Sequence, residues 1–315
     1  MRVGFALDPH LSSHNPSGRV DDYAAACLDK MEQFRMLAGT RMWQGAVFAG
    51  DLFNLSSVAR WFETEIIGIL KGFPCPVYAI AGNHDLKARR VSAIDEVILG
   101  SFFKAGVVKN LVESGLDFPP SAVAGTPGSS VVGMHFMSEP DGQVPEATAP
   151  NSWLVCHQYL GDEAGPETLS YGEILDKGYV GVVAGHEHND TGTINLDGLT
   201  VIRCGSMLRK ENAEFNFRQP RVAEVNFPTN EVVLHELAAA EPSAIFATKQ
   251  VGLDPEEVFD TDRLRAFATS LENRDFAEDA TEVDLLDKLV EDRGLIVGSE
   301  VHACLAGYFE KNGLR

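Results

Sequence analysis

The chain has 315 residues, of which 44% are hydrophobic and 23% are charged. This is the composition of a globular protein that is long enough to bury a full core, so wholesale disorder is excluded. The 46 acidic residues exceed the 26 basic residues and give a formal net charge of −20. Such a charge disfavours broad, nonspecific binding to nucleic acid or to anionic membranes.

The first half of the chain alternates short apolar runs with helical patterns. The runs are rich in Val, Ile and Phe, which is typical of strands buried on both faces. Apolar residues at three- and four-residue spacing predict helices over 21–37 and 58–70. The order strand, helix, strand, helix indicates an α/β fold with a mostly parallel sheet. The expected strands are Arg2–Leu7, Ala46–Ala49, Val77–Ala81, Trp153–Cys156 and Val180–Ala184.

The second half predicts short antiparallel strands separated by turn residues such as Asp197-Gly198. We expect them to form a second β layer. These strands are Val131–Met137, Gly192–Leu196, Leu199–Arg203, Val222–Phe227 and Val232–Leu237. After about residue 250 the chain becomes more acidic but keeps helical apolar stripes. We therefore expect one domain over 1–238, followed over 239–315 by a small acidic helical region that caps the site or docks a partner.

The cellular location follows from what the sequence lacks. No apolar run approaches the roughly 18 residues of a membrane-spanning helix, and the first residues do not resemble a secretory signal. The five cysteines are never spaced as Cys-x-x-Cys, so neither a disulfide framework nor a thiolate zinc site is expected. The sequence therefore predicts a cytoplasmic protein with no membrane partner.

Polar side chains follow five of the expected strands. Because ligands bind at the carboxyl ends of strands in open α/β sheets, we expect these side chains to meet at one rim. The groups are Asp8-Pro9-His10, Gly50-Asp51-Leu52-Phe53-Asn54, Gly82-Asn83-His84-Asp85, His157 and Gly185-His186-Glu187-His188. Glycines at the starts of three groups would let the backbone turn sharply and approach a ligand.

These residue types point to metal binding. Carboxylates, imidazoles and one amide form a ligand set suited to Mn²⁺, Fe or Zn²⁺. Seven such groups are too many for one ion and about right for two ions that share a carboxylate. Two cations about 3.5–4 Å apart can activate a water and bind phosphate oxygens.

In this order, the motifs D-x-H, G-D-x-x-N, G-N-H-D, a lone His and G-H-x-H resemble the calcineurin-like metallophosphoesterase superfamily. The resemblance spans roughly residues 3–205 and implies a four-layer sandwich of two mixed sheets flanked by helices. It implies that Asp8, His10 and His188 hold one metal, that Asn83, His157 and His186 hold the other, and that Asp51 bridges them. It also implies that His84 protonates the leaving group. Asp85 is expected to orient the His84 imidazole.

A narrower resemblance concerns the substrate. The G-D-L-F segment, the Gly205-Ser206 pair and a helical region after a final β pair resemble SbcD-like nuclease subunits, including those of bacteriophage recombination endonucleases. This implies a DNA exonuclease or endonuclease for repair and recombination. Its cofactors would be two divalent ions, with Mn²⁺ preferred and Fe, Zn²⁺ or Mg²⁺ as alternatives. Its partners would be DNA, an SMC-like coiled-coil ATPase and a second copy of the chain.

Other readings remain open from the sequence. A small-molecule phosphodiesterase or nucleotidase would use the same site, and a scaffold that keeps the fold without catalysis would have lost ligand residues. The acidic net charge opposes the DNA reading. Basic residues near the motifs are the candidates for contacts to DNA phosphates, and they are Lys87, Arg89, Arg90, Arg209, Lys210, Arg218 and Arg221.

Overall fold

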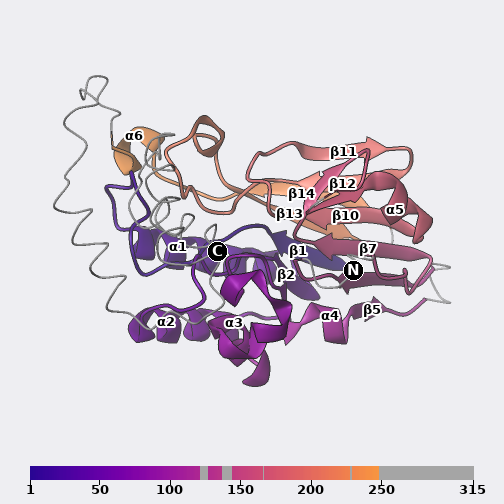
Figure 1. The fold of residues 1–315 in the computed structure, drawn as a ribbon, viewed down its shortest axis with the longest axis horizontal. Helices are drawn as coiled ribbons and strands as arrows, with labels where there is room; N and C mark the ends of the chain where they lie inside the picture. Colours follow the sequence, from indigo (N-terminus) through magenta and orange to yellow (C-terminus); the bar gives the residue numbers. More distant parts are fainter. Residues whose placement is uncertain (121–126, 137–143, 166, 228, 248–315) are drawn as a thin grey trace, which may run out of the picture.

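A computed structural model describes residues 1–120, 127–136, 144–165, 167–227 and 229–247. The helical stripes expected after residue 250 lie outside the described residues. Two six-stranded sheets form the body of the protein (Figure 1). The first has the order β14 (Glu231–Glu236), β13 (Arg221–Asn226), β1 (Arg2–Ala6), β2 (Gly45–Ala49), β3 (Val77–Ile80) and β4 (Lys109–Asn110).

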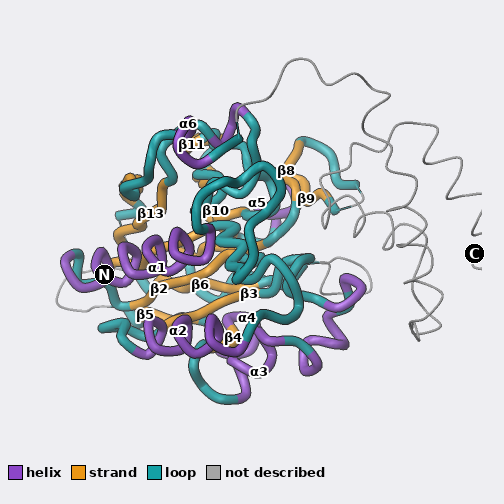
Figure 2. The backbone as a smooth tube through the Cα atoms, turned by 90° about the vertical axis from the view of Figure 1, so that its left-hand side faces the viewer, coloured by secondary structure: helices purple, strands orange, loops and turns teal. Residues whose placement is uncertain are grey.

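The second sheet has the order β11 (Gly192–Leu196), β12 (Leu199–Arg203), β10 (Tyr179–Ala184), β7 (Asn151–Cys156), β6 (Ser129–Gly133) and β5 (Leu116–Phe118). A separate two-stranded ribbon pairs β8 (Tyr159–Gly161) with β9 (Thr168–Ser170). The helices are α1 (Tyr23–Thr40), α2 (Arg60–Lys71), α3 (Ile98–Lys104), α4 (Leu111–Ser114), α5 (Tyr171–Asp176) and α6 (Pro242–Ile245). Short 3₁₀ turns are η1 (Lys87–Arg89), η2 (Val91–Glu96) and η3 (Glu214–Asn216). Figure 2 traces the backbone through the helices and strands from a second direction.

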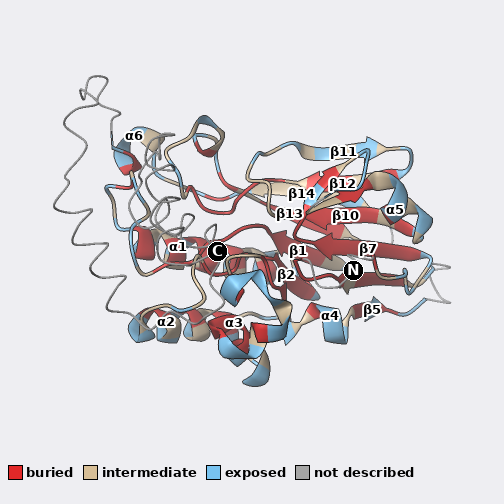
Figure 3. Ribbon diagram, in the orientation of Figure 1, coloured by how far each residue is buried: buried red, intermediate tan, exposed pale blue. Residues whose placement is uncertain are grey.

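Three apolar cores separate four layers, and strand β2 shows how. Its Phe48 packs with Phe34 of α1 and Phe62 of α2, whereas the neighbouring Val47 packs with Trp153 of the second sheet. This alternation follows from the two-residue period of side chains along a strand. A third core lies on the far face of the second sheet, where Ile174 of α5 packs. The central strands of both sheets are therefore buried on both faces, as Figure 3 shows in red for β1, β2, β7 and β10, and the expected helix-flanked pair of mixed sheets is confirmed.

The expected antiparallel pairing in the second half is confirmed in part. It holds for β11 with β12, for β13 with β14 and for β6 with β5, and in the first of these pairs Asp197 and Gly198 take the positive φ of a tight hairpin turn. On their other edges, β6 pairs with β7 in parallel and β12 pairs with β10 in parallel.

The division of strands between the sheets also differs from the expectation. The final pair, β13 and β14, joins the first sheet through antiparallel pairing of β13 with β1. The alternation of apolar residues encodes which faces of a strand are buried, but it does not encode the neighbour or the direction of pairing. None of the helices in the described part of the chain combines the length and apolarity needed to cross a membrane.

Candidate metal centre

The polar groups named from the sequence meet where the carboxyl ends of parallel strands from both sheets come together. Strands β1, β2 and β3 of the first sheet run parallel, as do β7 and β10 of the second sheet. The loop after each of these strands carries one group. We call the seven side chains that gather there the candidate metal centre, and they are Asp8, His10, Asp51, Asn83, His157, His186 and His188.

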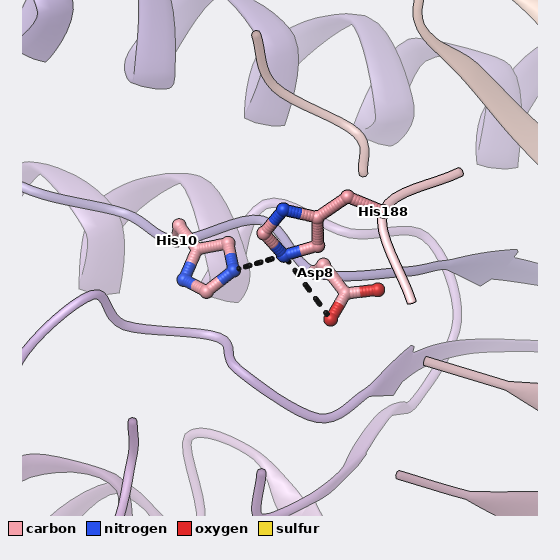
Figure 4. Close-up of side chains that lie close together, drawn as sticks. All are labelled: Asp8, His10 and His188. Atoms are coloured by element: carbon pink, nitrogen blue, oxygen red, sulfur yellow. Dashed lines mark hydrogen bonds and ion pairs between the residues drawn. The ribbon is translucent and has the colours of Figure 1, made fainter. Parts of the chain in front are cut away.

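The first part of this centre joins the loop after β1 to the loop after β10. One potential ligand atom from each of Asp8, His10 and His188 lies within 4.8 Å of the others. Figure 4 shows the three side chains close together. The Nε2 atoms of His10 and His188 are 2.8 Å apart. Asp8 and His10 are buried, and the side chain of His188 is 17% exposed. These are the three residues that the resemblance assigned to one ion.

The second part is built around His157, which is fully buried. Its Nε2 atom lies 3.2 Å from Oδ2 of Asp51 and 3.2 Å from Oδ1 of Asn83. The same Asn83 oxygen lies 3.1 Å from Nδ1 of His186. Asp51 also reaches the first part, because its Oδ2 is 3.6 Å from Nε2 of His10. The carboxylate of Asp51 therefore faces both halves of the centre.

His84 stands at the edge of this arrangement. Its backbone N–H donates to Oδ1 of Asp51 at 2.9 Å, and its ring lies edge-on to His10 with centroids 4.9 Å apart. Nδ1 of His84 is 3.1 Å from the backbone oxygen of Asn54. Because a carbonyl can only accept, this contact places a hydrogen on Nδ1 and leaves Nε2 as the nitrogen that can exchange a proton with a substrate.

The contacts of Asp85 correct one expectation. Its carboxylate accepts hydrogen bonds from the backbone N–H groups of Leu52 at 3.1 Å, Phe53 at 2.8 Å and Gly82 at 3.0 Å. These bonds tie the loop after β2 to the loop after β3. A fully buried carboxylate used in this way holds the two loops together, so the expected role of orienting the His84 imidazole passes to the Asn54 carbonyl.

The backbone around the centre is strained. Asp8, His10, Asp51 and His186 all have positive φ, between 46° and 84°, a conformation that residues other than glycine rarely adopt. Such strain typically costs about 1–3 kcal/mol per residue and concentrates at functional sites. The predicted need for glycine is also met, because a Cβ atom on Gly82 would overlap the side chain of Asp51.

Burial keeps most of the imidazoles neutral, as metal binding requires. It lowers the pKa of His188 to about 3 and that of His186 to about 4, and it holds the pKa of His10 well below its usual value. Burial raises the pKa of Asp8 to about 7. The charge of the Asp8 carboxyl at pH 7 therefore depends on whether a cation binds beside it.

Asp51 and His157 behave differently because they pair. Although burial alone would lower it, the charge of Asp51 and the contact with its carboxylate raise the pKa of His157 to about 9. Although burial alone would raise it, the His157 charge keeps the pKa of Asp51 well below its usual range. A cation that binds His157 would take the place of this proton.

The donor set fits divalent cations. Within the described part of the chain, Oδ2 of Asp8, Nδ1 of His10 and Nε2 of His186 are buried and lack a hydrogen-bond partner. Two imidazole nitrogens also face each other at 2.8 Å, where only one of them could donate a hydrogen. A cation at the centre accounts for the unpaired oxygen of Asp8 and for the close approach of the two imidazoles, since buried polar atoms are otherwise almost always paired.

Two residues that the sequence did not predict contact the centre. Tyr159 packs edge-on against His186 with ring centroids 4.4 Å apart, and Glu167 places Oε2 at 3.5 Å from Nε2 of His186. Both belong to the segment that forms the ribbon of β8 and β9. Tyr159 could have been noticed two residues after His157 at the end of a strand, but nothing in the sequence around Glu167 signals its position.

Residues 43–190 match the family of proteins described as calcineurin-like phosphoesterases. The match covers somewhat less than half of the chain, and it is to the same superfamily that the sequence motifs resemble. The matched segment contains Asp51, Asn83, His157, His186 and His188. The fold of the chain adds Asp8 and His10, which precede the matched segment, to the same cluster. A metal-dependent phosphoester hydrolase is the activity that the family and the cluster support together.

Similarity to individual proteins is low. One crystal structure shares 12% sequence identity, covers 75% of this chain and 99% of its own, and has a TM-score of 0.43. A dimetal phosphatase from Danio rerio also shares 12% identity, covers 75% of this chain and 95% of its own, and has a TM-score of 0.48. These similarities are too low to indicate an activity. No curated protein matches the chain significantly.

Proposed function

We propose that this protein is a metallophosphoesterase that hydrolyses phosphodiester bonds of DNA as the nuclease subunit of an SbcCD-like complex, with two divalent cations and Mn²⁺ as the proposed metal. The observation that carries the hydrolytic part is the gathering of Asp8, His10 and His188 beside Asp51 and His157 at one rim. His84 lies at the edge of that gathering and is left over from the proposed ligand set.

The proposed chemistry divides the work between ions and side chains. When bound, the two cations would supply an activated water and binding sites for the phosphate oxygens. His84 would act as the general acid. Its Nδ1–H donates to the Asn54 carbonyl, which stabilises the protonated ring, and Nε2–H would be given to the departing oxygen. The backbone N–H of His84 donates to Asp51 and holds the residue beside the centre, while the Asn54 contact orients its ring.

The DNA part of the proposal rests on the G-D-L-F and Gly205-Ser206 resemblances. Ser206 is buried, and its hydroxyl donates to the backbone oxygen of Asp8 at 2.7 Å. This contact links the Gly205-Ser206 pair to the centre, because it supports the loop that carries Asp8. The partially exposed His84, His186 and His188 leave the rim accessible to a polymer.

A small-molecule phosphodiesterase or nucleotidase is the second candidate, and the basic residues favour it. Arg218 and Arg221 pair with Asp190, with Nε–Oδ2 distances of 3.4 Å and 2.8 Å. Arg209 is buried and donates to the backbone oxygens of Arg218 and Ala240. These arginines stabilise the protein itself, so they are a poor DNA-binding surface. On the nuclease proposal, the ATPase partner must supply part of that surface.

The test is a substrate comparison with the purified full chain and Mn²⁺. Linear and circular DNA would be assayed with and without the SMC-like ATPase, beside bis-p-nitrophenyl phosphate and cyclic nucleotides. The nuclease proposal expects DNA cleavage that the ATPase increases, and light scattering would show a dimer. Rapid turnover of nucleotides without DNA cleavage, even with the ATPase, would establish the second candidate instead.

A further inference from the structure

The imidazole of His186 is held from outside the centre by the ribbon of β8 and β9. We propose that Glu167 is a positioning residue that fixes His186 so that its Nδ1 faces the second half of the candidate metal centre. This inference rests on the proposed two-metal function and adds a residue that neither the motifs nor the family match points to.

The two nitrogens of His186 face different partners. Nδ1 lies 3.1 Å from Oδ1 of Asn83, on the side of His157 and Asp51. Nε2 is buried, has no hydrogen-bond partner among the described residues, and lies 3.5 Å from Oε2 of Glu167. If Nδ1 binds a cation, the hydrogen of the neutral ring must be on Nε2, where the Glu167 carboxylate can accept it.

Glu167 is itself held in place. Its Oε1 accepts a hydrogen bond from Nη1 of Arg89 at 3.0 Å, and its backbone oxygen accepts from the N–H of Tyr159 at 2.9 Å. The ring of Tyr159 packs edge-on against His186 at 4.4 Å between centroids. The ribbon segment therefore contacts His186 through Tyr159 and Glu167, and Arg89 connects Glu167 to the 3₁₀ turn that follows Gly82-Asn83-His84-Asp85.

The backbone supports a specific role for this chain of contacts. Arg89, Glu167 and His186 have φ values of 54°, 57° and 84°. Three residues other than glycine in the left-handed region, joined end to end by their side chains, must be held there by surrounding contacts.

Carboxylates that accept a hydrogen bond from a metal-binding histidine orient the ring and increase its basicity, and losing one typically costs about 10–100-fold in metal affinity. Glu167→Ala should therefore weaken one of two Mn²⁺ sites by about 10–100-fold and leave the other near its original affinity. The Mn²⁺ affinity of Glu167→Gln at this site should lie between those of the wild type and Glu167→Ala, because the amide oxygen can accept the same hydrogen bond without the charge. Arg89→Gln should weaken the same site by a smaller factor.

The experiment is calorimetric titration of the metal-free full chain with Mn²⁺, together with thermal unfolding of each metal-free variant. Glu163→Ala is the matched control, because Glu163 is an exposed carboxylate in the same segment and should leave both sites unchanged. Equal affinities in Glu167→Ala and the wild type would overturn the positioning role alone. Equal weakening of both sites, with a lower unfolding temperature without metal, would overturn it in favour of a purely structural role. A wild-type chain that binds no Mn²⁺ would overturn both the positioning role and the proposed function.

Discussion

His10 and His188 bring their Nε2 atoms to within 2.8 Å of each other, although one follows the first strand of the chain and the other follows β10. Burial holds the pKa of His10 well below its usual value and lowers that of His188 to about 3, so both rings are neutral at pH 7. Two neutral imidazoles this close either share one hydrogen or point two lone pairs at a common cation.

The first prediction concerns metal removal. Chelation should abolish hydrolysis and lower the unfolding temperature, and Mn²⁺ should restore both. At a free concentration about 100 times the Kd, one bound ion stabilises the folded state by about 2.7 kcal/mol. Differential scanning calorimetry with and without Mn²⁺ measures this. An unfolding temperature that does not change with Mn²⁺ would contradict the assignment of these residues as ligands.

The second prediction tests the shared carboxylate. Asp51→Asn should lower the binding of both ions, because Oδ2 of Asp51 lies 3.2 Å from Nε2 of His157 and 3.6 Å from Nε2 of His10. Elemental analysis after dialysis against Mn²⁺ gives the stoichiometry. The control is Asp95→Asn, which removes an exposed carboxylate that pairs with Lys104 and takes no part in the centre. Retention of two ions per chain in Asp51→Asn would exclude a bridging Asp51.

The third prediction separates chemistry from binding at His84. His84→Ala should keep its metal content and lose about 10²–10⁴-fold in kcat on DNA, the usual contribution of a general acid. The loss should be smaller on bis-p-nitrophenyl phosphate, because nitrophenolate leaves without needing a proton. An equal loss on both substrates would show that His84 does something other than protonate the leaving group.

The sequence predicted the centre well because its chemistry is local to strand ends. Each ligand candidate follows a run of apolar residues that marks a buried strand, and residues at the ends of parallel strands meet at one edge of a sheet. Asp85 was misread because its neighbour in the sequence is His84, whereas its partners are backbone groups of a different loop. Glu167 was missed because its role depends on how a ribbon folds over His186, and no periodic pattern records that.

The fourth prediction follows from the corrected role of Asp85. Asp85→Asn should lower the free energy of unfolding by about 1–3 kcal/mol, because the amide nitrogen would be buried against backbone N–H donors without an acceptor. Urea unfolding of the metal-free protein measures this. Once saturated with Mn²⁺, the variant should keep most of its activity. If Asp85→Asn kept full stability but lost all activity, Asp85 would have a catalytic role instead of a structural one.

The fifth prediction is a pH dependence far from the centre. Glu224 of β13 is buried and accepts hydrogen bonds from Arg41, Trp43 and His235. Although burial alone would raise it, these bonds lower the pKa of Glu224 from 4.5 to about 2. A lowered pKa in the folded state stabilises the protein above pH 4.5, and this contribution is lost as the pH falls towards 2.

At about 1.4 kcal/mol per pH unit, Glu224 contributes about 3 kcal/mol at pH 7. Glu224→Gln should therefore be less stable than the wild type by roughly that amount at pH 7, and the difference should shrink below pH 4.5. Urea unfolding in the presence of a chelator at several pH values measures it. A difference that stays constant between pH 7 and pH 3 would show that the ionised carboxylate is not responsible.

The antiparallel pairing of Arg2 with Asn226 places the last described strands of the first sheet beside the first strand of the chain. During translation, one edge of β1 therefore stays open until residues 221–226 have left the ribosome. The loop carrying Asp8 and His10 depends on that strand for its position. A nascent chain that stalls before residue 221 would expose an unpaired strand edge, a state prone to aggregation.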